Sequence, residues 1–230
     1  MKKYKAVLFD LDGTLRTSQP EGFEAFVEYA SRVGLALTKD QIYCVEREAH
    51  RYWSGTRADE DMAHYDQREF WVNYNRLLLH AIGIKDQDDS AHQINDLFDE
   101  YDPIDVIFAD SRVVLKTLKA EGYTVGLVSN REEDLAPLVE KYGLTEFFDF
   151  TLSAGQAGCY KPAPGIFERA LKMAGNIAAS DAVYVGDNYF ADVVGARNVG
   201  MHVVLVDPRN IFADHYNYRV RHLRDVLKLI

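Results

Sequence analysis

Apolar residues in this 230-residue chain gather in short, nearly continuous runs. Four runs stand out, and a weaker fifth lies at 148–152; the four are at 6–9, 123–128, 182–185 and 202–206. Such runs are typical of strands buried on both faces. The helical segments expected between them end before glycines, at Val113–Ala120, Glu132–Tyr142 and Gly165–Ala174. Strands that alternate with helices predict an α/β fold, with a parallel sheet covered by helices on both faces.

The stretch from about Pro20 to Pro103 follows a different pattern. Apolar residues recur there at helical spacing, without an intervening strand. The four helices expected on this basis cover Phe23–Val33, a capping box at Thr38 and Gln41 leading to about Trp53, Phe70–Ala81, and Ile94–Tyr101. We therefore expect a core at residues 1–18 and 104–230 and an inserted helical bundle at 19–103. Most aromatic residues of the insertion are expected to form its own core.

Two carboxylates follow the first expected strand, in the segment from Val7 to Leu15. Asp10 and Asp12 are two residues apart, so continued strand geometry would point both to the same side. They would lie at the carboxyl end of a parallel strand, where open α/β sheets bind ligands. Because two close carboxylates repel, the pair favours a bound cation or one protonated member. The alternative is a strand that ends in a simple Asp-Gly turn.

Three later segments carry further candidate residues. Ser129 and Asn130 could cradle a phosphate at a strand-to-helix junction, or simply cap the next helix. Lys161 precedes two closely spaced prolines and could supply positive charge, or could be a solvated surface lysine. Asp187 ends the fourth strand, and Asp192 would lie in the first turn of the next helix, where it could stabilise the helix dipole. Together with the first pair, these carboxylates would suit Mg²⁺.

Composition and charge limit the partners. The formal net charge of -10 argues against nucleic acid and anionic membranes, and it requires local positive charge to attract an anionic substrate. The two cysteines, Cys44 and Cys159, indicate free thiols rather than a disulfide framework. The apolar run Ala6–Phe9 is too short for a signal peptide or a membrane span, so we expect a cytoplasmic protein. The oligomeric state cannot be read from the sequence.

The order and spacing of these four segments resemble the haloacid dehalogenase superfamily of phosphohydrolases. Val7–Leu15 is similar to the first motif of that family and Ser129 to the second. Lys161 is similar to the third, and Gly186-Asp187 with Asp192 to the fourth. The resemblance covers nearly the whole chain. It implies a Rossmann-like sheet of strand order 3-2-1-4-5 with a helical cap inserted after the first motif, as in the phosphoglycolate phosphatase-like branch.

The resemblance also implies roles for the motif residues. Asp10 would be the nucleophile, and Asp12 the general acid and base. The metal ligands would be Asp10, the backbone carbonyl of Asp12, Asp187 and, directly or through water, Asp192, all holding Mg²⁺. Ser129, Asn130 and Lys161 would hold the phosphoryl group. The implied activity is hydrolysis of a small phosphorylated metabolite, a phosphate monoester, through an aspartyl-phosphate.

Two alternatives use the same residues differently. A sugar phosphomutase of the same superfamily would use Asp10 and Asp12 alike but return the phosphoryl group to the sugar. A signalling receiver domain also uses an acceptor aspartate, Mg²⁺, a hydroxyl and a lysine, but such domains are shorter and carry no helical insertion. The aspartate at position 12 argues against a dehalogenase, whose leaving halide needs no protonation.

Two weaker expectations concern the remaining segments. Substrate choice is expected to lie in the insertion, where the polar stretch Ser54–Asp66 separates two helices. Arg57 in that stretch is the candidate that would face the active site and pair with a substrate anion. The tail Asn210–Ile230 is expected to form a closing helix, because its apolar residues recur at helical spacing.

Overall fold

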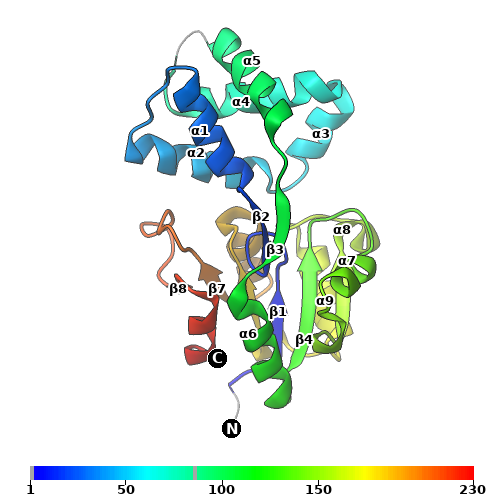
Figure 1. Cartoon of the computed structure of the whole chain (residues 1–230). Coiled ribbons are helices and arrows are strands. Elements are labelled where there is room, and N and C mark those ends of the chain that lie inside the picture. Colours follow the sequence, from blue (N-terminus) through cyan, green and yellow to red (C-terminus); the bar gives the residue numbers. More distant parts are fainter. Residues whose placement is uncertain (1–2, 85–86) are drawn as a thin grey trace. The chain divides into compact units, whose positions relative to one another are not determined.

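The computed structural model of the chain describes residues 3–84 and 87–230 (Figure 1). The chain divides into two compact units, one formed by residues 1–17 and 107–230 and the other by residues 18–106. The two crossings between the units fall within β2 (Arg16–Gln19) and β3 (Ile104–Ile107), which pair with each other as a two-stranded sheet. The catalytic and cap roles expected for the two units stay predictions.

The first unit is built on a six-stranded sheet of order β5-β4-β1-β6-β7-β8. Its strands are β1 (Ala6–Phe9), β4 (Thr124–Ser129), β5 (Phe150–Ser153), β6 (Ala182–Gly186), β7 (His202–Val206) and β8 (Arg219–Val220). All of their pairings are parallel. Numbered along the chain, the first five strands of this sheet thus follow the expected order 3-2-1-4-5, with β8 added at one edge. The prediction of an α/β, Rossmann-like fold is confirmed.

The register of the sheet brings three strand ends to one level. Phe9 of β1 lies opposite Leu127 of β4 and Val185 of β6. Because the strands are parallel, the residues that follow them emerge at the same edge of the sheet. Asp10, Ser129 and Asp187 are therefore brought together by pairings between segments far apart in the sequence.

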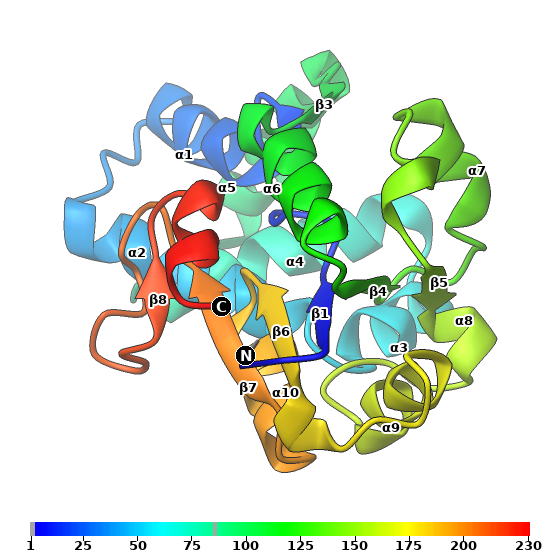
Figure 2. The same ribbon diagram turned by 90° about the horizontal axis from the view of Figure 1, so that it is seen from below.

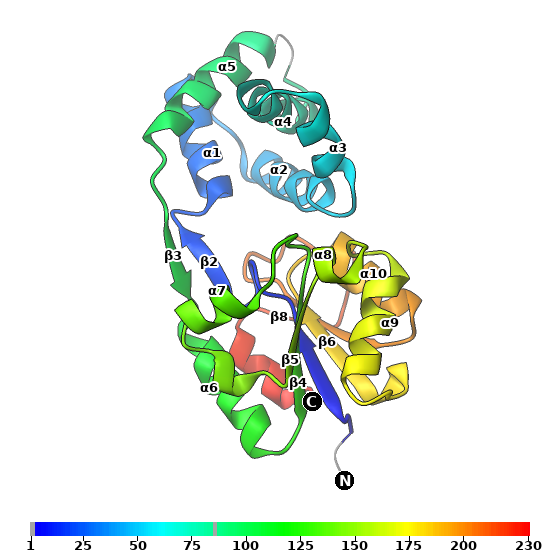
Figure 3. The same ribbon diagram turned by 90° about the vertical axis from the view of Figure 1, so that its right-hand side faces the viewer.

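Helices cover both faces of this sheet, as Figure 2 shows end-on. The helical segments of the unit are α6 (Ala109–Ala120), α7 (Ala136–Lys141), η2 (Thr145–Phe147), α8 (Ala154–Ala157), α9 (Pro164–Met173), η3 (Ala179–Asp181), η4 (Tyr189–Val193), α10 (Val194–Asn198) and η5 (Leu223–Lys228). Residues of α6, α7 and η5 pack with Val7 and Phe9 in one buried cluster. Leu8 points to the opposite face, where α9 and α10 lie (Figure 3).

Two expected helices of this unit differ from the structure. The helix predicted at Glu132–Tyr142 begins only at Ala136, because Pro137 occupies its second position and Asp134 accepts a hydrogen bond from the Ala136 amide at 3.1 Å. The closing helix predicted in Asn210–Ile230 is wrong. The tail forms the short strand β8 and the 3₁₀ helix η5, although Leu223 and Val226 are buried as the spacing indicated.

The second unit is a bundle of helices in its described part. They are α1 (Gly22–Arg32), α2 (Lys39–Tyr52), α3 (Arg57–His64), α4 (Gln67–Ala81), α5 (Gln87–Leu97) and the 3₁₀ turn η1 (Phe98–Glu100). The capping box predicted at Thr38 is present, with the Thr38 hydroxyl accepting from the Gln41 amide at 3.3 Å. Phe26, Val45 and Ile94 lie in its main buried cluster. The helical-bundle prediction for this region is confirmed in its architecture.

Helix α3 was not predicted. The stretch Ser54–Asp66 was expected to be a polar connection, because its sequence has no stripe of apolar residues at helical spacing. In the structure, Ala58 is the buried residue of this helix. The strands β2 and β3 were also missed. Strand β2 reads Arg-Thr-Ser-Gln and carries no apolar residue, and β3 is a run of only four residues, Ile-Asp-Val-Ile. No helix in the described part of the chain is long and apolar enough to cross a membrane.

Candidate active site

Lys161 lies at the centre of the buried charges at the sheet edge. Its Nζ donates to Asp10 Oδ1 at 2.6 Å, to Asp192 Oδ1 at 2.7 Å and to the Tyr184 hydroxyl at 3.1 Å. The hydroxyl of Tyr184 in turn donates to the carbonyl of Val128 at 2.9 Å. Lys161 and both carboxylates are buried, so solvent screens these contacts little. The lysine is therefore fixed against the aspartate at the end of β1.

Asn130 fixes the loop that carries this lysine. Its Oδ1 accepts from the Lys161 amide at 2.6 Å, and its Nδ2 donates to the Lys161 carbonyl at 3.0 Å. Ser129, also buried, accepts from the Arg131 amide at 3.3 Å. The Asn130 side chain therefore positions Lys161. The expected contact of Asn130 with a phosphoryl group stays a prediction.

Three carboxylates form a compact group. One oxygen each of Asp10, Asp187 and Asp192 lies within 4.8 Å of the others. Asp187 Oδ1 accepts from the Thr14 hydroxyl at 3.1 Å, and Asp192 Oδ2 accepts from the Asn188 amide at 3.0 Å. Asp192 lies in η4, a single π-helical turn before α10, and not in a regular helix start as expected. The group is held by backbone and hydroxyl donors on two different loops.

Two glycines allow this approach. A Cβ on Gly13 would lie 2.2 Å from Asp187 Oδ2, and the φ of +84° at Gly13 is one that side chains rarely permit. A Cβ on Gly186 would lie 2.2 Å from Asp192 Oδ2. Both positions therefore require glycine for the carboxylates to come together.

Burial and crowding shift the protonation of this group. Burial raises the pKa of Asp10 to about 7, although the Lys161 ammonium opposes the rise. Burial, with the neighbouring Asp10 and Asp192, raises the pKa of Asp187 well above its ordinary value. Burial alone would lower the pKa of Lys161, but Asp10 and Asp192 outweigh it and raise that pKa well above its ordinary value. The ammonium of Lys161 therefore stays charged, but this single positive charge is not enough to keep both Asp10 and Asp187 ionised at their ordinary pKa values.

A divalent cation would supply that charge. The three carboxylates face one ammonium, and hard oxygen ligands in this number suit Mg²⁺. The raised pKa values of Asp10 and Asp187 indicate that ionising the whole group is costly unless a further cation is present. The residues therefore fit the metal that the motifs imply, and the metal would offset their repulsion.

Asp12 is held apart from this group by two arginines. The guanidinium of Arg131 binds Asp12 in a bidentate manner: Nε donates to Oδ2 at 2.7 Å and Nη2 donates to Oδ1 at 2.9 Å. Arg16 Nη1 makes a further short hydrogen bond to Oδ1. Burial works to raise the pKa of Asp12, but Arg131 and Arg16 outweigh it and hold that pKa below its ordinary value. Asp12 is thus an ionised carboxylate beside the phosphate-binding candidates.

Comparisons with known proteins identify the family of the chain. A family model for haloacid dehalogenase-like hydrolases matches residues 4–200. The chain belongs to this family. Its relatives include haloacid dehalogenase-like hydrolase domain-containing protein 3 of Homo sapiens, 31% identical over 85% of this chain and 78% of that protein.

Two further relatives of this family member are named as phosphatases. Ribulose-1,5-bisphosphate 5-phosphatase of Halopiger xanaduensis is 32% identical over 88% of this chain and 84% of that one. Glyceraldehyde 3-phosphate phosphatase of Methanothermobacter thermautotrophicus is 31% identical over 88% of this chain and 85% of that one. A phosphatase structure from Thermococcus onnurineus shares the fold, with a TM-score of 0.56, 24% identity and coverage of 98% and 97% of the two chains. The chain is a phosphatase-type hydrolase of this family.

Sequence reasoning selected residues that the fold does bring together, but missed their partners. One edge of the sheet brings together five of the predicted residues: Asp10, Ser129, Lys161, Asp187 and Asp192. Asn130 contacts the backbone of Lys161. The missed contacts come from Arg16, Arg131, Tyr184 and Thr14. Arg131 directly follows the Ser129-Asn130 motif, and this adjacency is the signal that could have identified it.

Arg57, the candidate from the insertion, lies in the other unit. It is exposed at the start of α3, with its guanidinium 5.4 Å from the ring centre of Tyr52. Its expected role toward a substrate stays a prediction.

Proposed function

We propose that this protein is a Mg²⁺-dependent phosphatase that hydrolyses a small phosphorylated metabolite, a phosphate monoester, through an aspartyl-phosphate on Asp10. The observation that carries the proposal is the buried contact of Lys161 with Asp10 and Asp192, beside Asp187 at the same sheet edge. The phosphatase names of two relatives, both for sugar phosphates, support the substrate class.

The first step would transfer the phosphoryl group to the protein. An oxygen of Asp10 attacks phosphorus in line with the ester oxygen, and the phosphorus–oxygen bond of the ester breaks as the new bond forms. The Lys161 ammonium, already 2.6 Å from Asp10, would neutralise the phosphoryl oxygens as charge shifts onto them. Asp10, Asp187 and Asp192 would hold Mg²⁺, and the chemistry that the ion would supply is further charge neutralisation.

Asp12 would handle the protons in both steps. It gives a proton to the leaving alkoxide in the first step and becomes a carboxylate. In the second step it takes a proton from the attacking water, which releases inorganic phosphate and restores both Asp10 and the protonated Asp12. Because Arg131 and Arg16 hold Asp12 as a carboxylate here, the state present fits the second step, and the first step requires those contacts to loosen.

Ser129, Asn130 and Asp192 would play supporting roles. The Ser129 hydroxyl would hold a phosphoryl oxygen, and Asn130 would keep the lysine loop in place through its paired bonds to the Lys161 backbone. Asp192 would hold the Lys161 ammonium and contribute to the metal site.

Phosphate release from a panel of phosphate monoesters tests the proposal. The panel includes sugar phosphates, with Mg²⁺ present, and wild type is run beside Asp10→Asn. We expect release by wild type only, and retention of labelled phosphate on wild-type protein trapped by rapid acid quench. A folded wild-type protein that releases no phosphate from any ester would contradict the proposal, and conversion of one sugar phosphate into its isomer would indicate a mutase instead.

A further inference from the structure

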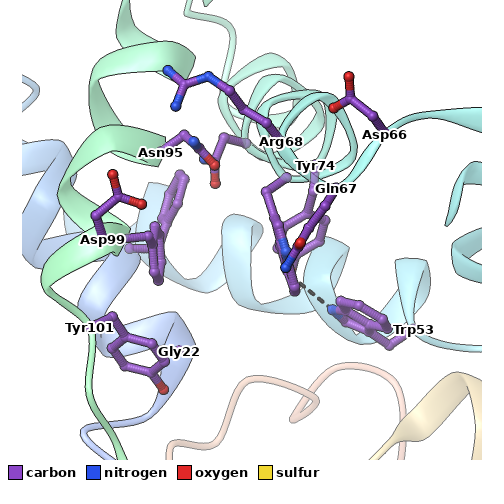
Figure 4. Close-up of a pocket in the computed structure, with 13 residues that line it drawn as sticks. Gly22, Trp53, Asp66, Gln67, Arg68, Tyr74, Asn95, Asp99 and Tyr101 are labelled. Carbon is purple, nitrogen blue, oxygen red and sulfur yellow. Dashed lines mark hydrogen bonds between the residues drawn. The ribbon is translucent and has the colours of Figure 1, made fainter.

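The helical unit contains a cavity of about 880 Å³ that the proposed phosphatase chemistry does not use (Figure 4). Its lining comes from α1, α4, α5, η1 and the segment after α2, all within residues 18–106. The size falls in the range of ligand sites, which are mostly apolar with a few placed polar groups. The lining residues that carry the argument are Trp53, Trp71, Tyr74, Asn75 and Asn95.

Aromatic side chains present their surfaces to this cavity. The chain has two tryptophans, and both line it, with 38% of Trp53 and 41% of Trp71 exposed. The Trp53 ring nitrogen donates to the Tyr74 hydroxyl at 3.1 Å, drawn as the dashed line in Figure 4. The rings of Trp53 and Trp71 are 6.0 Å apart, as are those of Trp71 and Tyr74. Exposed rings fixed in this way offer stacking surfaces to a flat ligand.

Two buried amides supply polar groups in the lining. Asn75 is 2% exposed, and its Nδ2 lies 3.5 Å from the Ala91 carbonyl, at the limit of a hydrogen bond. Asn95 is 8% exposed, and none of the described residues makes a hydrogen bond with its side-chain amide. Figure 4 shows Asn95 projecting from α5 into the space beside α4. The side-chain nitrogen and oxygen of Asn95 are not among the fully buried unpaired atoms of the described residues, so they are open to the cavity and available to a ligand.

The charges of the lining argue against an anionic ligand. Arg68 is the only cation among the thirteen lining residues of Figure 4, all of them described, and it is paired with Asp96 at 2.5 Å. The lining carboxylates are Asp66, which caps α4 through the Glu69 amide, and Asp99. A phosphate or carboxylate would therefore meet more negative than positive charge here. The charges of the lining therefore disfavour an anionic ligand.

From these contacts we infer that the cavity binds an uncharged planar heteroaromatic ring whose edge carries a hydrogen-bond donor beside an acceptor, as a nucleobase does. An asparagine amide offers one donor and one acceptor side by side, and it pairs with such an edge through two hydrogen bonds. Any base can stack on an aromatic side chain, because every base has a π-face. The tryptophans supply the faces and Asn95 the edge contact.

Tryptophan fluorescence tests this inference directly, because both tryptophans of the chain line the cavity and red-edge excitation selects them over the tyrosines. The intact protein is titrated with adenosine, guanosine, cytidine and uridine, excited at the red edge of tryptophan absorption to avoid absorption by the bases. Ribose and benzyl alcohol are the comparison ligands, since the first lacks the ring and the second lacks the paired edge. We expect saturable quenching by at least one nucleoside and none by the comparison ligands.

The variant Asn95→Leu separates recognition from simple stacking. Leucine has a similar volume but no hydrogen-bonding group, so we expect nucleoside binding to weaken about tenfold or more while the protein stays folded. The matched control is Asn198→Leu, at an exposed position of the other unit. No saturable quenching by any nucleoside at millimolar concentration, or equal binding by wild type and Asn95→Leu, would overturn the inference.

The ring could belong to the substrate of the phosphatase or to a separate effector. A nucleoside that raises KM for the best phosphate ester and leaves kcat unchanged would assign the cavity to the substrate. A change in kcat would assign it to an effector. This kinetic comparison depends on the proposed function, but the fluorescence titration does not, so a protein without phosphatase activity would leave the binding result intact.

Discussion

The sheet edge of the first unit and the cavity of the helical unit are built from opposite kinds of residue. At the sheet edge three carboxylates gather around one ammonium, and Lys161 contacts Asp10, Asp192 and Tyr184. In the cavity, aromatic faces stay exposed and the amide of Asn95 lacks a partner among the described residues. The first arrangement concentrates charge for a reaction on an anion, whereas the second is suited to hold a neutral ring. The predictions below separate these two kinds of site.

Replacing the proposed nucleophile should have the largest effect. Asp10→Asn keeps the shape of the side chain but removes the attacking carboxylate, so we expect phosphate release to fall by roughly 10⁴-fold or more. Lys161 retains Asp192 as a partner, so the fold should survive. Steady-state phosphate release, with melting temperatures measured in parallel, checks both points. Asp214→Asn, an exposed aspartate of the same unit, is the control and should match wild type.

Replacing the central lysine should reduce both activity and stability. Lys161→Met leaves Asp10 and Asp192 buried without their ammonium, which should cost about 3–5 kcal/mol of the free energy of unfolding. Loss of its charge at the phosphoryl group should lower kcat roughly 10²–10³-fold. Denaturant unfolding and phosphate release measure the two losses. Lys172→Met, at an exposed position of α9, should show neither; equal stability of the two variants would argue against the buried pairing.

The ease of predicting the two sites from sequence differs for a physical reason. A parallel sheet carries strand-end residues to one edge, so Asp10, Ser129 and Asp187 could be placed together once the strands were recognised. Lys161 was placed by its motif. The arginines that hold Asp12 were missed. The position of Arg131 directly after Ser129-Asn130 could have marked it as a candidate, but neither its spacing nor that of Arg16 indicates which carboxylate they contact.

The helical unit gave less information because an aromatic residue that lines a cavity has the same helical spacing as one in a core. Phe70 and Tyr74 lie on the same helix, yet Phe70 is buried while Tyr74 borders the cavity. The predictions for helix α3 and for the tail failed for a related reason. Periodicity reports burial, and it reported Leu223 and Val226 correctly, but it does not distinguish a 3₁₀ turn from an α-helix when the segment is short.

Removing one of those arginines should have an intermediate effect. Arg131→Gln deletes both Arg131 hydrogen bonds to Asp12, which hold the carboxylate that the second step uses, so hydrolysis of the aspartyl-phosphate should slow about tenfold, the value of one charge-assisted hydrogen bond. Because Arg131 holds the pKa of Asp12 down, that pKa should rise in the variant. The pH limb at which the proposed acid loses its proton should therefore move to higher pH. A profile of kcat/KM against pH measures this shift, with a variant of the exposed Arg221, Arg221→Gln, as the control. If the limb stays at the same pH in Arg131→Gln, Asp12 is not the group that transfers the proton.

Metal binding should depend on pH because the metal needs ionised carboxylates. The pKa of Asp10 is raised to about 7, so ionising it destabilises the metal-free fold progressively as the pH rises from the ordinary aspartate range through 7. Bound Mg²⁺ reverses that cost, and below about pH 7 its affinity should drop about tenfold per pH unit for one displaced proton. The melting-temperature gain with Mg²⁺ should thus be larger at about pH 8 than at about pH 6. An equal gain at both values would place the metal away from Asp10.

The smallest expected effect distinguishes the two tryptophans of the cavity. Trp53→Phe removes the donor of the 3.1 Å bond to Tyr74, so the free energy of unfolding should fall by about 0.5–1.5 kcal/mol. Trp71 has no hydrogen bond from its ring nitrogen among the described residues and is similarly exposed, so Trp71→Phe should cost less. Urea unfolding of both variants measures the difference, and equal costs would mean that the Trp53 bond contributes nothing. Each variant also leaves a single tryptophan, so the one whose fluorescence still responds to a nucleoside is the ring on which the base stacks.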